Sequence, residues 1–212
     1  MSDHHNEPFW RKYIFSVDHK IIGIQYGITS LLFLLFGFIL MLVMRWNIAN
    51  PGQAVPFIGG LLSEEGMLTP DKYNSFGAMH GTIMVFLGVV PLAVGAFGNY
   101  VVPIQVGAPD MAFPKLNMAS YWVYFVGGVI MLSSFFMPSG TASSGWTMYA
   151  PLASIANTGE TIWLISMLFL ITSSLLGSAN IIVTVVQLRA PGLTWMRLPF
   201  FVWTQFITAY LL

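Results

Sequence analysis

Two polar residues lie where a membrane-crossing helix would normally be apolar. His80 is near the start of the apolar stretch SFGAMHGTIMVFLGVVPLAVGAFGNY, and Arg45 ends an earlier apolar stretch that begins at Ile21. Because an ionisable side chain is costly in hydrocarbon, an intramembrane histidine predicts a functional site. An imidazole can ligate a metal and a guanidinium can bind polar groups, so the pair is suited to a cofactor with both. The alternatives are that Arg45 reaches the interface and that His80 bonds a neighbouring helix.

A second set of polar residues falls at the opposite end of the same stretch. Asn99 ends the stretch, and the Pro- and Gly-rich segment that follows carries Asp110 and Asn117. A carboxylate at the mouth, with amides and hydroxyls leading inward, is what a water-filled proton path requires, because buried waters need polar partners. The alternatives are a solvated turn carboxylate and hydroxyls that bond their own helix. The candidates within the apolar stretches are Tyr26, Thr172, Ser173, Ser174 and Asn180.

Membrane helices must position these side chains. The 212 residues are 56% hydrophobic and 8% charged, whereas a soluble domain carries about 25% charged residues. A helix rises about 1.5 Å per residue and the hydrocarbon core is about 30 Å thick, so a span needs about 20 apolar residues. We expect an all-α, polytopic transmembrane helix bundle that forms a single domain over 1–212, with four full spans and the start of a fifth. The stretches are 21–44, 75–100, 121–137, 161–186 and 198–212.

Lys and Arg predict the orientation of the bundle. With the N-terminus inside, six of the eight basic residues fall in inner segments, and only Arg45 and Lys72 fall in outer ones. Because inner segments carry the excess of basic residues, the N-terminus is predicted to be inside. His80 then lies about 8 Å below the outer end of its span. The outer segments 46–74 and 138–160 are long enough to fold over a site, and the fifth stretch, which stops without a polar flank, suggests part of a longer protein.

Composition excludes several classes of site and partner. No Cys is present, so disulfides and thiolate metal sites are excluded, and a metal must be held by His, Met or oxygen ligands. Eight basic and eight acidic residues cancel, so the net charge favours neither nucleic acid nor an acidic substrate. The polar N-terminus, MSDHHNEPFWRKY, has no apolar run before a small-residue cleavage site, and no signal peptide is predicted.

Five sequence strings together resemble subunit I of the heme-copper terminal oxidases of the cytochrome c oxidase type. The resemblance extends from Trp10 to Leu212, and in this family the subunit has about a dozen spans. It therefore implies the N-terminal portion of a longer subunit. GAPDMAFP and SGWTMYAPL are highly specific when they occur in this order. The strings are FSVDHKIIGIQYG, FGAMHGTIMVF, GNYVVPIQVGAPDMAFPKLN, SGWTMYAPL and TSSLLGSANIIVT.

The resemblance implies a role for each candidate residue. His80 corresponds to one of two axial ligands of the low-spin heme iron, and Arg45 to the arginine that bonds a substituent of that heme. In the outer loop, Trp146 and Tyr149 correspond to aromatics that cover the heme propionates. Asp110 corresponds to the carboxylate at the mouth of the main proton-uptake channel. The implied polar groups beyond Asp110 are Asn99, Asn117, Tyr26, Ser173, Ser174 and Asn180.

The implied activity is electron transfer from cytochrome c through the low-spin heme, expected to be heme A, to a second, high-spin heme and copper that reduce oxygen to water, with proton pumping. The copper ligands, the second axial histidine and the channel-end glutamate are expected on later helices, so these 212 residues alone are expected to be inactive. Implied partners are the copper-bearing subunit II, subunit III, cytochrome c and membrane lipid, with no nucleic acid. The bacterial inner membrane is expected, ahead of the mitochondrial one. The alternatives are a quinol-oxidising member and a non-enzymatic transport or structural bundle.

Three other histidines and one substitution complete these expectations. His4 and His5 are interpreted as solvated tail residues, and His19, in the DHKIIG string, is expected to fix the start of the first helix. Met118 stands where many family members have a second consecutive Asn. The group of amides behind Asp110 is therefore expected to be smaller.

Overall fold

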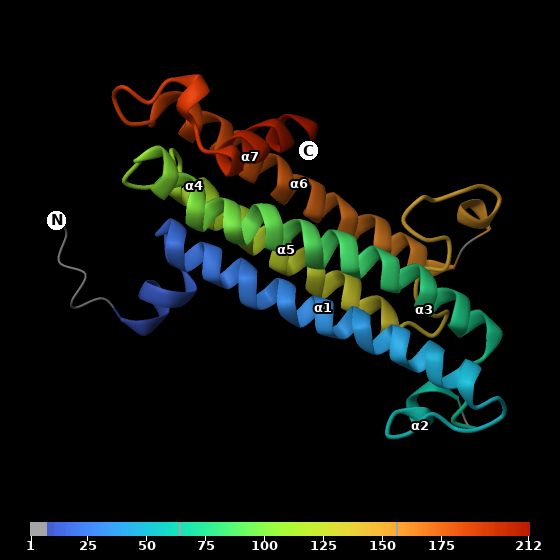
Figure 1. The fold of residues 1–212 in the computed structure, drawn as a ribbon. Helices are drawn as coiled ribbons and strands as arrows, with labels where there is room; N and C mark the ends of the chain where they lie inside the picture. Colours follow the sequence, from blue (N-terminus) through green and yellow to red (C-terminus); the bar gives the residue numbers. More distant parts are fainter. Residues whose placement is uncertain (1–7, 64, 156) are drawn as a thin grey trace. The chain divides into compact units, whose positions relative to one another are not determined.

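The computed structural model describes residues 8–63, 65–155 and 157–212, and every regular element within those ranges is helical (Figure 1). Four helices are long and apolar enough to cross a membrane, which confirms the all-α transmembrane prediction. A shorter apolar helix, α7 (Phe200–Leu211), lies within the predicted start of a fifth span. The four candidate spans are His19–Ala49, Pro70–Val106, Pro114–Phe136 and Thr158–Gln187.

The helical elements are bounded as follows. The α-helices that precede α7 are α1 (His19–Ala49), α2 (Gly59–Leu62), α3 (Pro70–Thr82), α4 (Asn99–Val106), α5 (Pro114–Ser133) and α6 (Thr158–Gln187). The π-helical turns are η2 (Trp10–Ile14), η3 (Ile83–Val89) and η4 (Pro91–Gly98). The short 3₁₀ turns are η5 (Ser134–Phe136), η6 (Leu152–Ser154) and η7 (Trp195–Arg197).

The helices extend beyond the apolar stretches because capping residues, and not hydropathy, set their ends. The α3 helix begins at Pro70 behind Thr69, whose hydroxyl accepts a hydrogen bond from the Lys72 amide at 3.4 Å. The segment ends at Gly107, which has a φ of 75° that favours glycine. His80 therefore lies about 15 Å along the helix from its start, and its predicted depth of about 8 Å below the outer end of the apolar stretch stays a prediction.

Proline explains the π-helical turns in the second span. Pro91 lies inside the continuous helical segment Pro70–Val106, where it is the first residue of η4 and follows closely after η3. Proline has no backbone N–H and its ring crowds the preceding turn, so a regular α-helix is disfavoured there. Wider turns accommodate the ring without ending the span.

Contacts divide the chain into two compact units, and each of the four candidate spans contributes residues to both. Unit 1 contains the described residues up to 29 together with 90–125 and 169–212. Unit 2 contains 30–89 and 126–168. The Asp110 group of predicted residues belongs to unit 1, and the His80 group belongs to unit 2.

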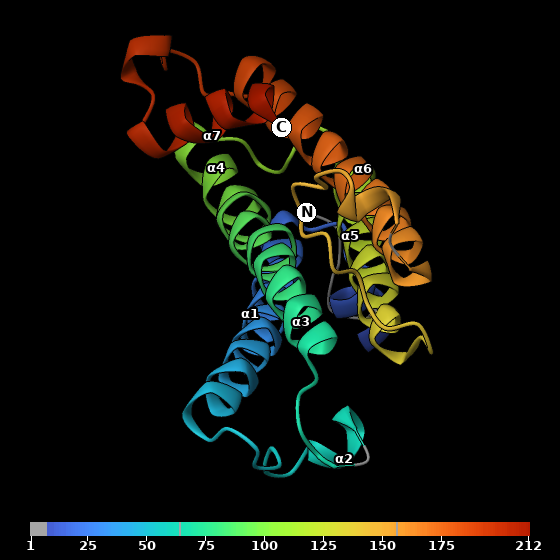
Figure 2. The same ribbon diagram turned by 90° about the vertical axis from the view of Figure 1, so that its right-hand side faces the viewer.

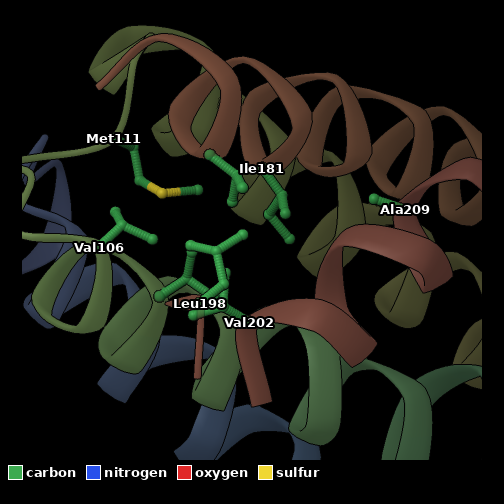
Figure 3. Packing of buried hydrophobic residues seen from close by; sticks show 8 residues of the cluster. Val106, Met111, Ile181, Leu198, Val202 and Ala209 are labelled. Carbon is green, nitrogen blue, oxygen red and sulfur yellow. The ribbon is translucent and has the colours of Figure 1, made fainter. Parts of the chain in front are cut away.

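Unit 1 has an apolar core formed by α4, α6 and α7. The α4 and α7 helices pack against each other (Figure 2). Side chains from all three helices and from Met111 and Leu198 meet in this core (Figure 3). The core places the segment that carries Asp110 against α6. Its buried members are Val102, Val106, Met111, Ile181, Val185, Leu198, Val202 and Ala209.

Unit 2 depends on close helix approach at glycines. A Cβ at Gly37 of α1 would lie 2.8 Å from the Met84 sulfur of η3. A Cβ at Gly77 of α3 would lie 3.3 Å from the Met44 methyl group of α1. Small residues let membrane helices approach closely. The α1 backbone is thereby brought near the helical segment that carries His80.

Candidate functional site

His80 has one ring nitrogen held by the backbone of another helix. Its Nδ1 lies 2.8 Å from the carbonyl oxygen of Gly37 on α1. A carbonyl can only accept, so Nδ1–H is the donor, and in the neutral ring Nε2 carries the lone pair. Metal-ligating histidines characteristically hold their second nitrogen in this way. The helix-to-helix hydrogen bond considered above as an alternative is present, and it leaves Nε2 suited to a metal.

Arg45 lies on α1 about 12 Å along the helix axis from Gly37. Its side chain is exposed, and α1 continues past it to Ala49. Its guanidinium is accessible to a polar substituent of a bound ligand. The assignment of Arg45 to a cofactor stays a prediction.

The loop between α5 and α6 brings an aromatic residue to the His80 segment. A Cβ at Gly81 would lie 3.9 Å from Cδ1 of Trp146. The ring centroids of Trp146 and Phe86 are 6.1 Å apart. Trp146 remains 55% exposed and Tyr149 76% exposed. Trp146 is therefore beside the turn that carries His80, whereas Tyr149 projects mostly outward.

Asp110 lies in the segment between α4 and α5 and is half-buried. Its Oδ1 accepts a hydrogen bond from the Met111 amide at 2.6 Å. Burial raises the pKa of the Asp110 carboxyl above its usual value, and the Met111 N–H partly opposes that shift by stabilising the charged form. A half-buried carboxyl with a raised pKa differs from the fully solvated turn residue considered as the alternative. It is better suited to proton exchange.

Asn99 and Asn117 carry buried amide atoms with no protein partner among the described residues. Asn99 donates from Nδ2 to the Gly95 carbonyl at 2.7 Å, but its Oδ1 is unpaired. Asn117 is 0% exposed, and neither its Oδ1 nor its Nδ2 has a partner. Buried polar groups are normally satisfied by protein or by ordered water. These amides are therefore suited to binding water.

Three hydroxyl groups from three helices form a connected network. The Tyr26 hydroxyl of α1 lies 3.1 Å from Oγ of Ser120 on α5 and 3.3 Å from Oγ of Ser173 on α6. Ser173 in turn donates to the Ser120 carbonyl at 2.7 Å, and Ser120 donates to the Asn117 carbonyl at 2.7 Å. Sequence reasoning missed Ser120, although it lies three residues after Asn117 and so on the same side of α5.

Asn180 has a different environment from the one expected for a water ligand. Its Oδ1 accepts from the Phe113 amide at 2.9 Å, and its Nδ2 donates to the Phe113 carbonyl at 3.3 Å. Thr184, one turn later, accepts from the Ala112 amide at 2.9 Å. Together they fasten the segment after Asp110 to α6. Ser174 is half-buried on the same helix and stays a prediction.

His19 joins the first helix to the second span. It is buried, and its Nδ1 donates to the Asn99 carbonyl at 2.9 Å. Asp18 caps the helix start by accepting from the Lys20 amide at 2.7 Å. His4 and His5 lie outside the described residues. Within the described ranges, no group of three His, Asp or Glu side chains gathers to hold a metal ion.

Comparison of the sequence with known proteins identifies the family to which this chain belongs. Residues 21–212 match the family model described as cytochrome C and quinol oxidase polypeptide I. The chain is 42% identical over 204 residues to cytochrome c oxidase subunit 1 of Thermostichus vulcanus, covering 95% of this chain and 34% of that protein. It is 38% identical over 214 residues to cytochrome c oxidase subunit 1 of Synechocystis sp., covering 100% of this chain and 36% of that protein.

A third relative gives the same coverage. The probable cytochrome c oxidase subunit 1-alpha of Streptomyces avermitilis is 37% identical over 203 residues, which is 94% of this chain and 33% of that protein. The chain thus spans about a third of the length of the curated relatives it matches. This membrane-spanning, all-helical chain belongs to the cytochrome c and quinol oxidase polypeptide I family, the subunit I family of the heme-copper oxidases.

Proposed function

We propose that these residues are the N-terminal portion of the catalytic subunit of a respiratory terminal oxidase. The complete subunit would pass electrons from cytochrome c through a low-spin heme to a heme-copper centre that reduces oxygen to water, with coupled proton pumping. The observation that carries the proposal is the His80 imidazole, whose Nδ1 is held by Gly37 at 2.8 Å and whose Nε2 is left for iron.

The residues of unit 2 fit a heme. His80 would ligate the iron through Nε2, Arg45 would bond a polar substituent, and Trp146 and Tyr149 would cover the propionates. A heme held by two histidines transfers electrons without an open position for oxygen. The second histidine, the high-spin heme and the copper ligands would come from the remainder of the subunit. Heme A is the proposed heme type.

The residues of unit 1 fit a proton path. Asp110 would take up protons at the inner surface, because its half-buried carboxyl has a raised pKa. Asn99 and Asn117 would hold waters through their unpaired amide atoms, and the Tyr26, Ser120 and Ser173 hydroxyls would continue the path. Reduction of one oxygen molecule to water consumes four electrons and four protons. Asn180 would support the path by fixing the segment after Asp110.

The proposed setting is the bacterial inner membrane, with a copper-bearing subunit II, subunit III and cytochrome c as partners. The names of the relatives support cytochrome c as the donor, while the family description includes quinol oxidases. The purified complex would distinguish the donors. We expect the complex to oxidise ferrocytochrome c. If it oxidised only quinol, the proposed electron donor would be wrong, whereas the assignment of His80 to a heme would stand.

The decisive experiment is His80→Ala in the complete oxidase complex. We expect the low-spin component of the reduced-minus-oxidised visible spectrum to disappear, because the iron loses an axial ligand. The matched control is His5→Ala in the N-terminal tail, which should keep the wild-type spectrum. A wild-type low-spin signal in His80→Ala would overturn the proposal.

A further inference from the structure

A buried carboxylate in unit 2 has no role in the site described above. Glu160 lies in the first turn of α6 and is only 4% exposed. Burying a carboxylate is costly unless hydrogen-bond donors satisfy it. The hydrogen-bond partners of the buried Glu160 carboxylate therefore indicate its role.

Both oxygens of Glu160 contact the loop that precedes α6. Oε2 accepts a hydrogen bond from the Ser143 amide at 3.3 Å, and Oε1 accepts one from the Ser144 hydroxyl. The helix N-terminus adds its partial positive charge, which favours a carboxylate in the first turn. Glu160 thus fastens residues 143 and 144 to the rigid start of α6.

Neighbouring contacts hold the same loop. Asn157 donates from Nδ2 to the Ser139 carbonyl at 2.6 Å. A Cβ at Gly159 would lie 2.8 Å from the Cα of Thr141, so only glycine lets the loop approach the helix this closely. The Thr141 hydroxyl lies 2.6 Å from the Ser134 hydroxyl at the end of the third span. Among these contacts, the bonds from Glu160 to Ser143 and Ser144 hold the loop at the point nearest in sequence to Trp146.

The attached residues, Ser143 and Ser144, lead directly into Trp146. From Ser144 the chain passes through Gly145, whose φ of 72° favours glycine, directly to Trp146. The Trp146 indole then packs against the helix at Gly81 and Phe86, beside the turn that carries His80. If Ser143 and Ser144 were released, the indole would keep only its own packing at Gly81 and Phe86.

We propose that Glu160 is a positioning residue that holds the Trp146 loop against the His80 turn and thereby sets the polarity around the bound heme. This inference rests on the proposed function, because it requires a heme at His80. Burial and access of water are among the factors that set the reduction potential of a heme. Loosening the loop would admit water, which favours the more charged ferric form.

The test is Glu160→Ala in the complete oxidase complex, with two measurements. Hydrogen exchange of the amides in 143–148 should become faster. At a fixed applied potential, the ratio of reduced to oxidised low-spin heme should fall, because water around a heme favours its oxidised form. Ser144→Ala removes one of the two donors without altering α6, and it should change both measurements in the same direction.

Two further variants separate geometry from charge. Glu160→Gln keeps an oxygen acceptor and loses the charge, so it should retain most of the wild-type ratio if the hydrogen bonds matter. Glu65→Ala, at an exposed carboxylate of another outer segment, should change neither measurement.

An unchanged heme ratio in both Glu160→Ala and Ser144→Ala, with faster loop exchange, would overturn the inference. Unchanged loop exchange in both variants would overturn it as well. Failure of the proposed function has a different signature, because the wild-type complex would then show no low-spin heme at all, whereas faster exchange in Glu160→Ala would still establish the attachment.

Discussion

A histidine can bind a metal and a protein acceptor at once, because its two ring nitrogens point in different directions. His80 uses Nδ1 for the Gly37 carbonyl and so presents Nε2. Asp110 has a comparable dual character, since its carboxyl is half-buried yet lies in the connection between the second and third candidate spans. At the scale of single residues, both candidate functions depend on how the side chain is held.

Asp110→Asn should slow oxygen-consuming turnover about tenfold or more and abolish proton pumping while both hemes remain bound, because an amide cannot exchange a proton as a carboxyl does. Turnover and proton release can be measured in vesicles that contain the complete complex. Asp71→Asn, at an exposed carboxylate of α3, serves as the control. Normal proton uptake in Asp110→Asn would refute the assignment of Asp110.

The raised pKa of Asp110 also predicts a pH-dependent stability difference. The folded state favours the protonated carboxyl, so its stabilising contribution is present below the ordinary carboxyl pKa of about 4 and is lost as pH rises through the raised folded value. The apparent Tm of the wild type should therefore fall relative to Asp110→Asn as pH rises from 4 to 7. A constant difference across that range would contradict the pKa direction.

At the scale of elements, α6 positions both groups of residues. Its N-terminal turn holds the Trp146 loop through Glu160. Its C-terminal half holds the segment after Asp110 through Asn180 and Thr184. The backbone hydrogen bonds of a helix are satisfied within the helix. Its side chains can therefore bond the backbone N–H and C=O groups of an irregular segment, which lack such internal partners.

Asn180→Ala should loosen the segment after Asp110. The backbone N–H of Phe113 would lose its partner, which costs about 1–3 kcal/mol when such a group stays buried, whereas the Phe113 carbonyl would keep the Asn117 amide at 3.0 Å. Hydrogen exchange of the amides in 110–113 should rise by about tenfold, since 1.4 kcal/mol corresponds to a factor of ten.

The matched control for Asn180→Ala is Gly177→Ala on the same helix, where an added Cβ meets nothing within 4 Å. It should leave that exchange unchanged. Equal exchange in the two variants would show that Asn180 does not fasten the segment.

At the scale of the whole molecule, the segments that connect the four candidate spans differ in length. Lys72 lies in the first turn of α3 and Trp146 in the connection after the third span, whereas Lys115 lies in the first turn of α5 and Arg189 follows α6. The distribution of basic residues predicts that the N-terminus is inside. Both the heme and proton assignments require this orientation, because in the proposed oxidase electrons and protons would reach the centre from opposite sides.

Single cysteines can test the orientation, since these 212 residues contain none. In a cysteine-free version of the complete subunit, Ser154→Cys should react with an impermeant maleimide added to intact cells. Lys12→Cys should react only after the cells are opened. Both positions are exposed, so access to the side chain is not limiting. If the two positions were labelled in the opposite way, the N-terminus would be outside, and both the heme and the proton-path assignments would be contradicted.

The sequence alone predicted features that depend on composition along the chain. Hydropathy identified the four spans and the beginning of another, and the cost of a charge in lipid singled out His80. Strings such as GAPDMAFP predicted the family, which the comparisons confirmed. The helix ends were less accurate, because Thr69 and Gly107 extend the second span at each end beyond its apolar part.

Only the tertiary structure decided which groups meet. His80 bonds a carbonyl 43 residues away, and Tyr26 contacts serines 94 and 147 residues away. Helix packing also places Asn180 against the backbone of Phe113 and Ser120 within the hydroxyl network. It places Glu160 against Ser144 in the loop that carries Trp146. Hydropathy fixes that a segment crosses the membrane, because lipid acts on each segment separately. The partners of its polar atoms depend on helix rotation and close approach, which arise only when the segments pack together.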